Sequence, residues 1–155
     1  MSRKIVLKSI LAIAMVGFVL VSVSCKKEEK QIIGKWKFDK VEIKELACTD
    51  PITETVAKMV LPAIANGIVT ETGLEAVEFT KDGKAITKKE TAKYKVNGNK
   101  LTITNSDYIS GTSDISFDKK TMYWDMNVLD FVGEVDVTDI GIIKCIMRIT
   151  YTKSK

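Results

Sequence analysis

The sequence predicts a mainly β fold, an up-and-down antiparallel barrel of eight strands with one helix between the first and second strands. About eight short segments alternate apolar and polar residues with a period of two, so each has one apolar face. Turn signals such as Asp82-Gly83 and Asn97-Gly98 join consecutive segments. Rolling these hairpins into one barrel buries every apolar face without exposed edges, whereas a two-sheet sandwich, the alternative, needs longer crossovers.

The first predicted strand begins at Ile33 and ends near Leu46. The parity of its apolar residues changes between Phe38 and Val41. One extra residue in the strand would return both sets to the same face, so we expect a β-bulge near residues 39–40.

The only helix expected in the mature chain covers residues 51–66. Asp50 is a good N-cap, Gly67 suits the C-terminal cap, and Pro62 should kink or split the helix. Its apolar face should pack on the barrel as a lid rather than lie on a membrane, because its polar side has few basic residues. Helical spacing assigns these residues to that face: Ile52, Val56, Met59, Val60, Ala63 and Ile64.

Seven further strands are expected after the helix. A weak strand surrounds Ile86, and the last strand runs from Gly141 to about Thr152. The apolar faces of the other strands and of the last one contain Val77 and Phe79; Tyr94 and Val96; Leu101 and Ile103; Ile115 and Phe117; Met122, Trp124, Met126 and Val128; and Ile143, Cys145, Met147, Ile149 and Tyr151.

The first 24 residues have the pattern of a secretory signal peptide. A basic start leads into an apolar segment at residues 10–21 that is too short to span a bilayer comfortably. The following Val21-Ser22-Val23-Ser24-Cys25 resembles a bacterial lipobox, which implies acylation of Cys25 and cleavage just before it. Cleavage at an ordinary small-residue site is the alternative.

Residues 25–32 are expected to form a flexible tether between the lipid and a barrel domain at residues 33–153, because this short run is charged. Lys27-Glu28-Glu29 is similar to the surface-export signal of Bacteroidota lipoproteins. We therefore expect an outer-membrane lipoprotein of the bacterial cell envelope, on the periplasmic face or the cell surface, whose N-terminal lipid makes the membrane its partner.

Composition argues against several classes of function. Three of the 24 basic residues and none of the 20 acidic ones precede Cys25, so the remaining 131 residues carry a net charge of +1 and give no reason to expect nucleic acid as a partner. The chain has no histidine, the commonest general base. It also lacks a glycine-rich phosphate motif. We expect no enzyme and no cofactor.

Cys48 and Cys145 are expected to form a disulfide, since closing the barrel brings the end of the first strand beside the start of the last. Two unpaired buried thiols are the alternative. A zinc site with Asp50 lacks the usual ligand spacing, so no metal site is expected. The acidic stretch Asp130, Glu134, Asp136 and Asp139 is interpreted as a loop, with calcium or substrate binding as the alternative.

Three segments resemble the lipocalin-like domains of small Bacteroidota lipoproteins. They are Ile33-Gly34-Lys35-Trp36-Lys37-Phe38, Val77-Glu78-Phe79-Thr80-Lys81-Asp82-Gly83-Lys84, and Tyr94-Lys95-Val96-Asn97-Gly98-Asn99-Lys100-Leu101-Thr102-Ile103. The resemblance covers about residues 32–152 and implies an eight-stranded lipocalin-like barrel.

Trp36, Tyr94 and Trp124 are expected to face inward, where they either fill the interior or line a cavity for one small ligand. The first expected function is binding of a small apolar ligand in the barrel interior at the cell envelope. The alternative is a packed, ligand-free barrel that acts through its surface as a structural or protein-interaction module.

Overall fold

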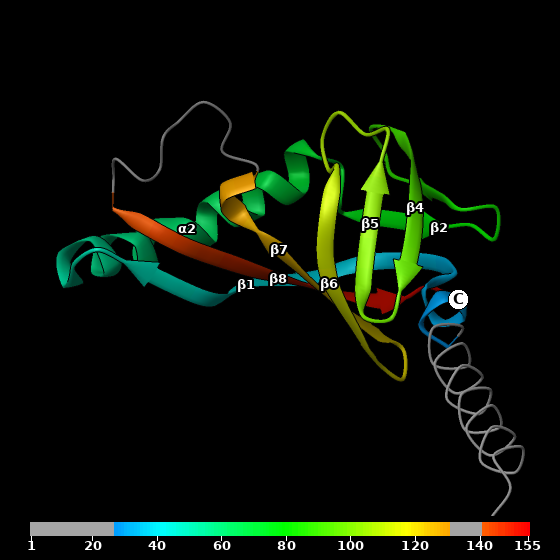
Figure 1. Cartoon of the computed structure of the whole chain (residues 1–155), viewed down its shortest axis with the longest axis horizontal. Coiled ribbons are helices and arrows are strands. Elements are labelled where there is room, and N and C mark those ends of the chain that lie inside the picture. Colours follow the sequence, from blue (N-terminus) through cyan, green and yellow to red (C-terminus); the bar gives the residue numbers. More distant parts are fainter. Residues whose placement is uncertain (1–26, 131–140) are drawn as a thin grey trace, which may run out of the picture.

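Alternating side chains form a closed barrel of eight antiparallel strands in the structure, a computed structural model that describes residues 27–130 and 141–155 (Figure 1). Each strand pairs with the next and β8 pairs with β1, which confirms the expected fold. The strands are β1 (Gly34–Cys48), β2 (Ala76–Phe79), β3 (Lys84–Ile86), β4 (Thr91–Asn97), β5 (Lys100–Thr104), β6 (Gly111–Asp118), β7 (Thr121–Asn127) and β8 (Ile142–Lys153); a 3-10 turn, η1 (Val128–Asp130), follows β7.

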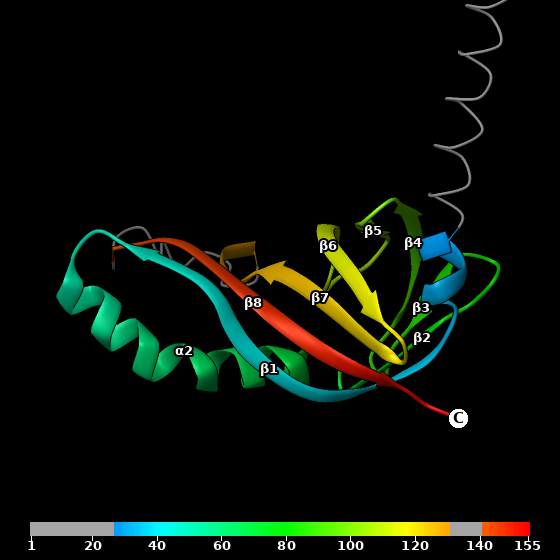
Figure 2. The same cartoon turned by 90° about the horizontal axis from the view of Figure 1, so that it is seen from below.

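The two longest strands, β1 and β8, pair from Trp36 to Cys48 of β1 and extend beyond the barrel as a twisted ribbon (Figure 2). β2 covers only residues 34–37 of β1. The register of β1 on β8 shifts between Phe38 and Lys40, which confirms the bulge expected from the change of parity. Further shifts follow between Ile43 and Glu45 and between Ala47 and Cys48.

The start of β8 differs from the expected alternation. The shift near Cys48 pairs this residue with Ile142 and leaves Ile143 without a partner in the register. Ile142 is therefore buried, whereas Ile143 is 61% exposed, so its assignment to the inner face was wrong.

One continuous helix, α2 (Pro51–Glu71), connects β1 to β2 and lies along the β1–β8 ribbon (Figure 2). The Asp50 carboxylate caps it by accepting hydrogen bonds from the amides of Ile52 and Thr53, at 3.0 and 2.9 Å. Pro62 lies inside the helix and does not split it.

The helix ends later than expected because its C-terminal cap is not Gly67. Thr72 is the cap residue, and Gly73 follows with a φ of +72°, a conformation that favours glycine. The amide of Gly73 donates to the carbonyl of Thr70, and that of Leu74 donates to the carbonyl of Val69. These two bonds form a Schellman motif, with buried Leu74 as its apolar contact.

The face of α2 that packs on the fold is not the expected one. Its buried residues are Ala57, Leu61, Ala65 and Val69, which recur every four positions. Small alanine side chains let the helix approach the ribbon closely. The face expected to be buried, from Ile52 to Ile64, is exposed.

The described part of the expected tether, residues 27–32, is helical. Ile32 at its end is fully buried, and its carbonyl accepts a hydrogen bond from Trp36 Nε1 at 2.6 Å. The carbonyl of Gln31 accepts another from Lys153 Nζ at 3.1 Å. The packed fold therefore begins at Ile32. Cys25 and the signal segment lie outside the described residues.

Candidate functional site

The three aromatic residues expected to face inward all do so. Trp36 and Trp124 are 1% exposed, and Tyr94 is partly buried. Their rings contact other aromatic rings: the Phe79 centroid lies 4.9 Å from that of Tyr94 and 6.3 Å from that of Trp124. Tyr151, fully buried, lies 6.3 Å from Trp124. These side chains fill the interior with aromatic contacts.

The polar atoms of the interior aromatics bond to the protein itself. Trp124 Nε1 donates to Ser113 Oγ at 2.5 Å, and the hydroxyl of Tyr94 donates to the carbonyl of Thr80 at 2.8 Å. The hydroxyl of Tyr151 donates to the carbonyl of Leu74 at 2.9 Å, and its burial raises its pKa. These donors are committed to the fold and offer nothing to orient an interior ligand.

The expected disulfide is absent from the structure, in which Cys48 and Cys145 are both free thiols. The topology behind that prediction is correct, since both lie at the same end of the β1–β8 ribbon. However, the register pairs Cys145 with Leu46 and Cys48 with Ile142, so the two cysteines are not directly opposite each other. Burial raises the pKa of the Cys145 thiol to about 11, and it also raises the pKa of the Cys48 thiol, with a smaller effect from Glu54 and Asp50.

We expect Cys145 to resist alkylation in the folded protein, because only the thiolate reacts. Its pKa of about 11 leaves roughly a hundredfold less thiolate at pH 8 than an ordinary cysteine has. Iodoacetamide labelling followed by peptide mass spectrometry measures this rate, with the urea-unfolded protein as the control. Rapid labelling of native Cys145, or a peptide linking Cys145 to Cys48, would contradict the free, buried thiol.

An apolar groove runs along the N-terminal half of α2. It has a volume of about 320 Å³. Its lining consists of Ile142 of β8 and five residues of α2, namely Ile52, Thr53, Val56, Ala57 and Val60. Of the seven large apolar side chains that are exposed in the described residues, five lie on α2. An exposed apolar patch of this kind is typical of a binding surface.

Other hollows in the structure are less suited to an apolar ligand. A groove of about 470 Å³ crosses β1 and β2, but nearly half of its lining residues are charged. Another of about 280 Å³ lies beside β6 and β7 and is also lined mainly by charged and polar side chains. The α2 groove, by contrast, has Thr53 as the single polar residue among the described residues that line it.

Negative charge lies at the N-terminal end of the groove. Besides the two helix amides, the Asp50 carboxylate accepts hydrogen bonds from the hydroxyls of Thr53 and Thr49, at 2.7 and 3.1 Å. The bonds from Thr53 and its neighbours hold the pKa of Asp50 below its usual value. Glu54 lies one turn along the helix and pairs with Lys58 at 2.5 Å. Of these two acids, Glu54 has an ion-pair partner, whereas Asp50 has none among the described residues.

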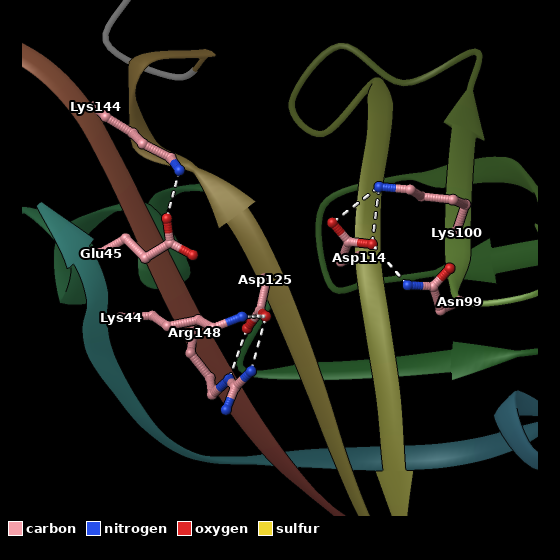
Figure 3. Close-up of polar contacts among 8 residues, drawn as sticks. All are labelled: Lys44, Glu45, Asn99, Lys100, Asp114, Asp125, Lys144 and Arg148. Carbon is pink, nitrogen blue, oxygen red and sulfur yellow. Dashed lines mark hydrogen bonds and ion pairs between the residues drawn. The ribbon is translucent and has the colours of Figure 1, made fainter.

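A row of charged residues crosses the outer face of the barrel (Figure 3). The register places these five side by side on successive strands: Lys100, Asp114, Asp125, Arg148 and Glu42. The side chain of Asp125 is 9% exposed; Arg148 donates to both of its oxygens, at 2.7 and 2.8 Å, and Lys44 Nζ lies 2.6 Å away. Asp114 pairs with Lys100 at 2.8 Å. This row contributes to stability rather than to a binding site, since each acid is already paired.

The expected acidic loop lies largely outside the described residues, which include Asp130 but not Glu134, Asp136 or Asp139. Asp130 accepts a hydrogen bond from Asn127 at 3.1 Å. Within residues 27–130 and 141–155, no cluster of three or more acidic, cysteine or histidine residues could hold a metal ion.

Comparisons with family models, curated proteins and solved structures find no match to this chain. Sequence reasoning missed the groove because it assigned Ile52, Val56 and Val60 to the buried face. The signal that could have revealed it is the second apolar stripe, Ala57, Leu61, Ala65 and Val69, which left one of the two faces without a partner.

Proposed function

We propose that this chain is a lipoprotein, acylated at Cys25 and held at the outer membrane of a bacterial cell envelope, which binds a small apolar molecule in the α2 groove. The observation that carries the proposal is the groove itself, an apolar hollow of about 320 Å³ flanked by exposed branched side chains. Its size falls at the lower end of the range of small-molecule sites, and such sites are usually apolar with few polar groups.

The filled barrel interior supports a ligand site outside the barrel. An interior ligand would have to displace rings that are already in contact, such as Phe79 and Trp124. It would also break hydrogen bonds between buried groups, which is costly. The α2 groove requires no such displacement, because Ile52 and Val56 are 78% and 55% exposed.

The position of the groove also supports a soluble ligand rather than the anchoring membrane. Cys25 lies two residues before Lys27, so the reach of the chain keeps its Cα within about 7 Å of the Cα of Lys27. Residues 27–32 and the N-terminal half of α2 lie at opposite ends of the molecule in both views (Figures 1 and 2). The N-terminal half of α2, which lines the groove, therefore lies far from the segment that follows the proposed lipid anchor.

We expect Nile red, an uncharged apolar fluorophore, to bind the protein saturably and Val56→Gln to weaken this binding about tenfold or more. The change removes an apolar wall and places an amide that the ligand would desolvate, an effect of roughly 1.5 kcal/mol or more. Fluorescence titration measures the affinity. Ile143→Gln, an equally exposed position on the outer side of β8, is the matched control and should leave the affinity unchanged. Equal losses in both variants would contradict a site on α2.

We expect Cys25→Ser to abolish incorporation of labelled palmitate and to release the protein from the membrane fraction. The diacylglyceryl group needs this thiol, and stable anchoring needs the acyl chains. Metabolic labelling and cell fractionation measure both effects. Cys48→Ser provides the control, because Cys48 lies within the fold and should keep full labelling. Palmitate retained in the Cys25→Ser protein would rule out this anchor.

A protein-interaction module is the second candidate function, favoured by the extent of the apolar face. Met59 and Ile64 lie beyond the groove lining and are 77% and 43% exposed. A photo-cross-linker placed at position 59 in cells, with position 143 as the control, distinguishes the two functions. A single protein adduct specific to position 59 would favour the module, whereas adducts with small molecules alone favour ligand binding.

A further inference from the structure

Resting on the proposed function, we infer that the α2 groove takes a single hydrocarbon chain whose head group is cationic or neutral and not anionic. Two features carry this inference. One is the apolar lining of the groove, which follows α2 from Ile52 to Val60, and the other is the Asp50 charge at its end.

The shape of the groove fits one linear chain. Its wall follows α2 from Ile52 to Val60, a rise of about 12 Å at 1.5 Å per residue. Ala57 and Ile142 in this lining are buried, whereas Val56 is 55% exposed. An apolar lining of this length matches one extended hydrocarbon chain.

The head-group preference follows from what surrounds Ile52, where the groove meets the helix N-terminus. An uncapped helix N-terminus attracts anions through its free amides. Here those amides already bind the Asp50 carboxylate, and the hydroxyls of Thr49 and Thr53 bind it as well. An anionic head would find no free donor among these groups and would be repelled by Asp50. A cationic head would be attracted, and a neutral one would be unaffected.

Nearby basic residues do not reverse this preference. Lys58 lies one turn beyond Glu54 and is paired with it at 2.5 Å. Lys144 is paired with Glu45. The raised pKa of Cys48, due first to burial and then to Glu54 and Asp50, is consistent with negative potential at this end of the ribbon.

Photolabelling of the full chain tests the inference. The probes are three dodecyl amphiphiles with a diazirine near the chain end and a trimethylammonium, maltoside or sulfate head, used below their critical micelle concentrations. Peptide mapping reads out labelling of residues 52–60 alone, so binding elsewhere does not interfere. At low ionic strength, we expect half-saturation by the trimethylammonium probe at a concentration roughly five- to tenfold below that of the sulfate probe. Added salt should reduce the ratio.

Asp50→Asn is the decisive variant, because asparagine caps a helix about as well as aspartate while removing the charge. The ratio between the cationic and anionic probes should fall to near one in this variant, with the maltoside probe unchanged. Equal or tighter binding of the sulfate probe to the unaltered chain would overturn the head-group inference and leave the proposed function standing. Failure of all three probes to label residues 52–60 would overturn the proposed function as well.

Discussion

Trp124→Ala is expected to lower the free energy of unfolding by about 3–5 kcal/mol, the usual cost of deleting a buried tryptophan. Its ring is 1% exposed and contacts both Phe79 and Tyr151, so the deletion leaves a cavity that rigid aromatic neighbours cannot close. The Ser113 hydroxyl also loses its indole donor. Because domains of this size are stable by about 5–15 kcal/mol, the loss is a large part of the total.

Urea unfolding followed by far-UV circular dichroism measures this change. Tyr108→Ala removes an aromatic ring that is 46% exposed and should change the stability by less than about 0.5 kcal/mol. Added indole should partly restore the Trp124→Ala protein by filling the cavity, since a ligand that binds only the folded state stabilises it. A loss below about 1 kcal/mol would mean that the interior is loosely filled, and an interior ligand would then become the better proposal.

The barrel could be predicted from the sequence because strand alternation carries most of the information. A one-residue slip would expose a whole apolar face, so parity fixes which residues point inward. The change of parity between Phe38 and Val41 even located a bulge. The same reasoning failed at Ile143, because a third irregularity, between Ala47 and Cys48, shifts the pairing there. The alternation of the sequence does not reveal this shift.

The site could not be predicted from the helix pattern, because α2 is apolar on two faces. Periodicity selected the face with the larger side chains, from Ile52 to Ile64, as the buried one. The ribbon instead packs against the smaller residues Ala57 and Ala65. Which face of the helix is buried depends on how closely the helix can approach the ribbon, and this distance is a property of the tertiary structure. The prediction of a disulfide differs from the structure for a related reason. Whether Cys48 lies opposite Cys145 depends on the register of β1 on β8, and β-bulges change that register.

The charged row on the outer barrel face leads to the second large effect. Asp125 stands opposite Asp114 in the register, and like charges directly opposite are unfavourable. The arrangement holds because each acid has its own cations: Arg148 and Lys44 at Asp125, and Lys100 at Asp114 (Figure 3). The Arg148 guanidinium also lies 5.2 Å from the centre of the Tyr123 ring, which fixes its orientation.

Asp125→Ala is expected to lower the free energy of unfolding by about 2 kcal/mol. Removing one partner of a fully buried ion pair costs more, about 3–5 kcal/mol, but Arg148 and Lys44 are 26% and 38% exposed and can regain water. Chemical denaturation measures the loss. Glu45→Ala is the matched control: Glu45 of β1 pairs with Lys144 of β8, but the two side chains are 45% and 53% exposed, so the free energy of unfolding should change by less than about half as much as in Asp125→Ala.

The pH dependence of stability distinguishes the contribution of the Asp125 charge from the contribution of its packing. Burial alone would raise the pKa of this carboxyl, but hydrogen bonds from Arg148 and Lys44 outweigh burial and hold the pKa below its usual value. The unfolded chain therefore takes up this proton first on acidification, at its ordinary pKa of about 3.9. Stability from the Asp125 charge is complete well above that pH and is lost as the pH falls through the folded-state pKa.

The difference in unfolding free energy between the unaltered protein and Asp125→Asn should thus be constant from pH 8 to about 6 and shrink below about pH 5. A difference that stays constant down to pH 3 would show that the carboxylate charge contributes nothing, and that packing alone accounts for the effect of Asp125→Ala.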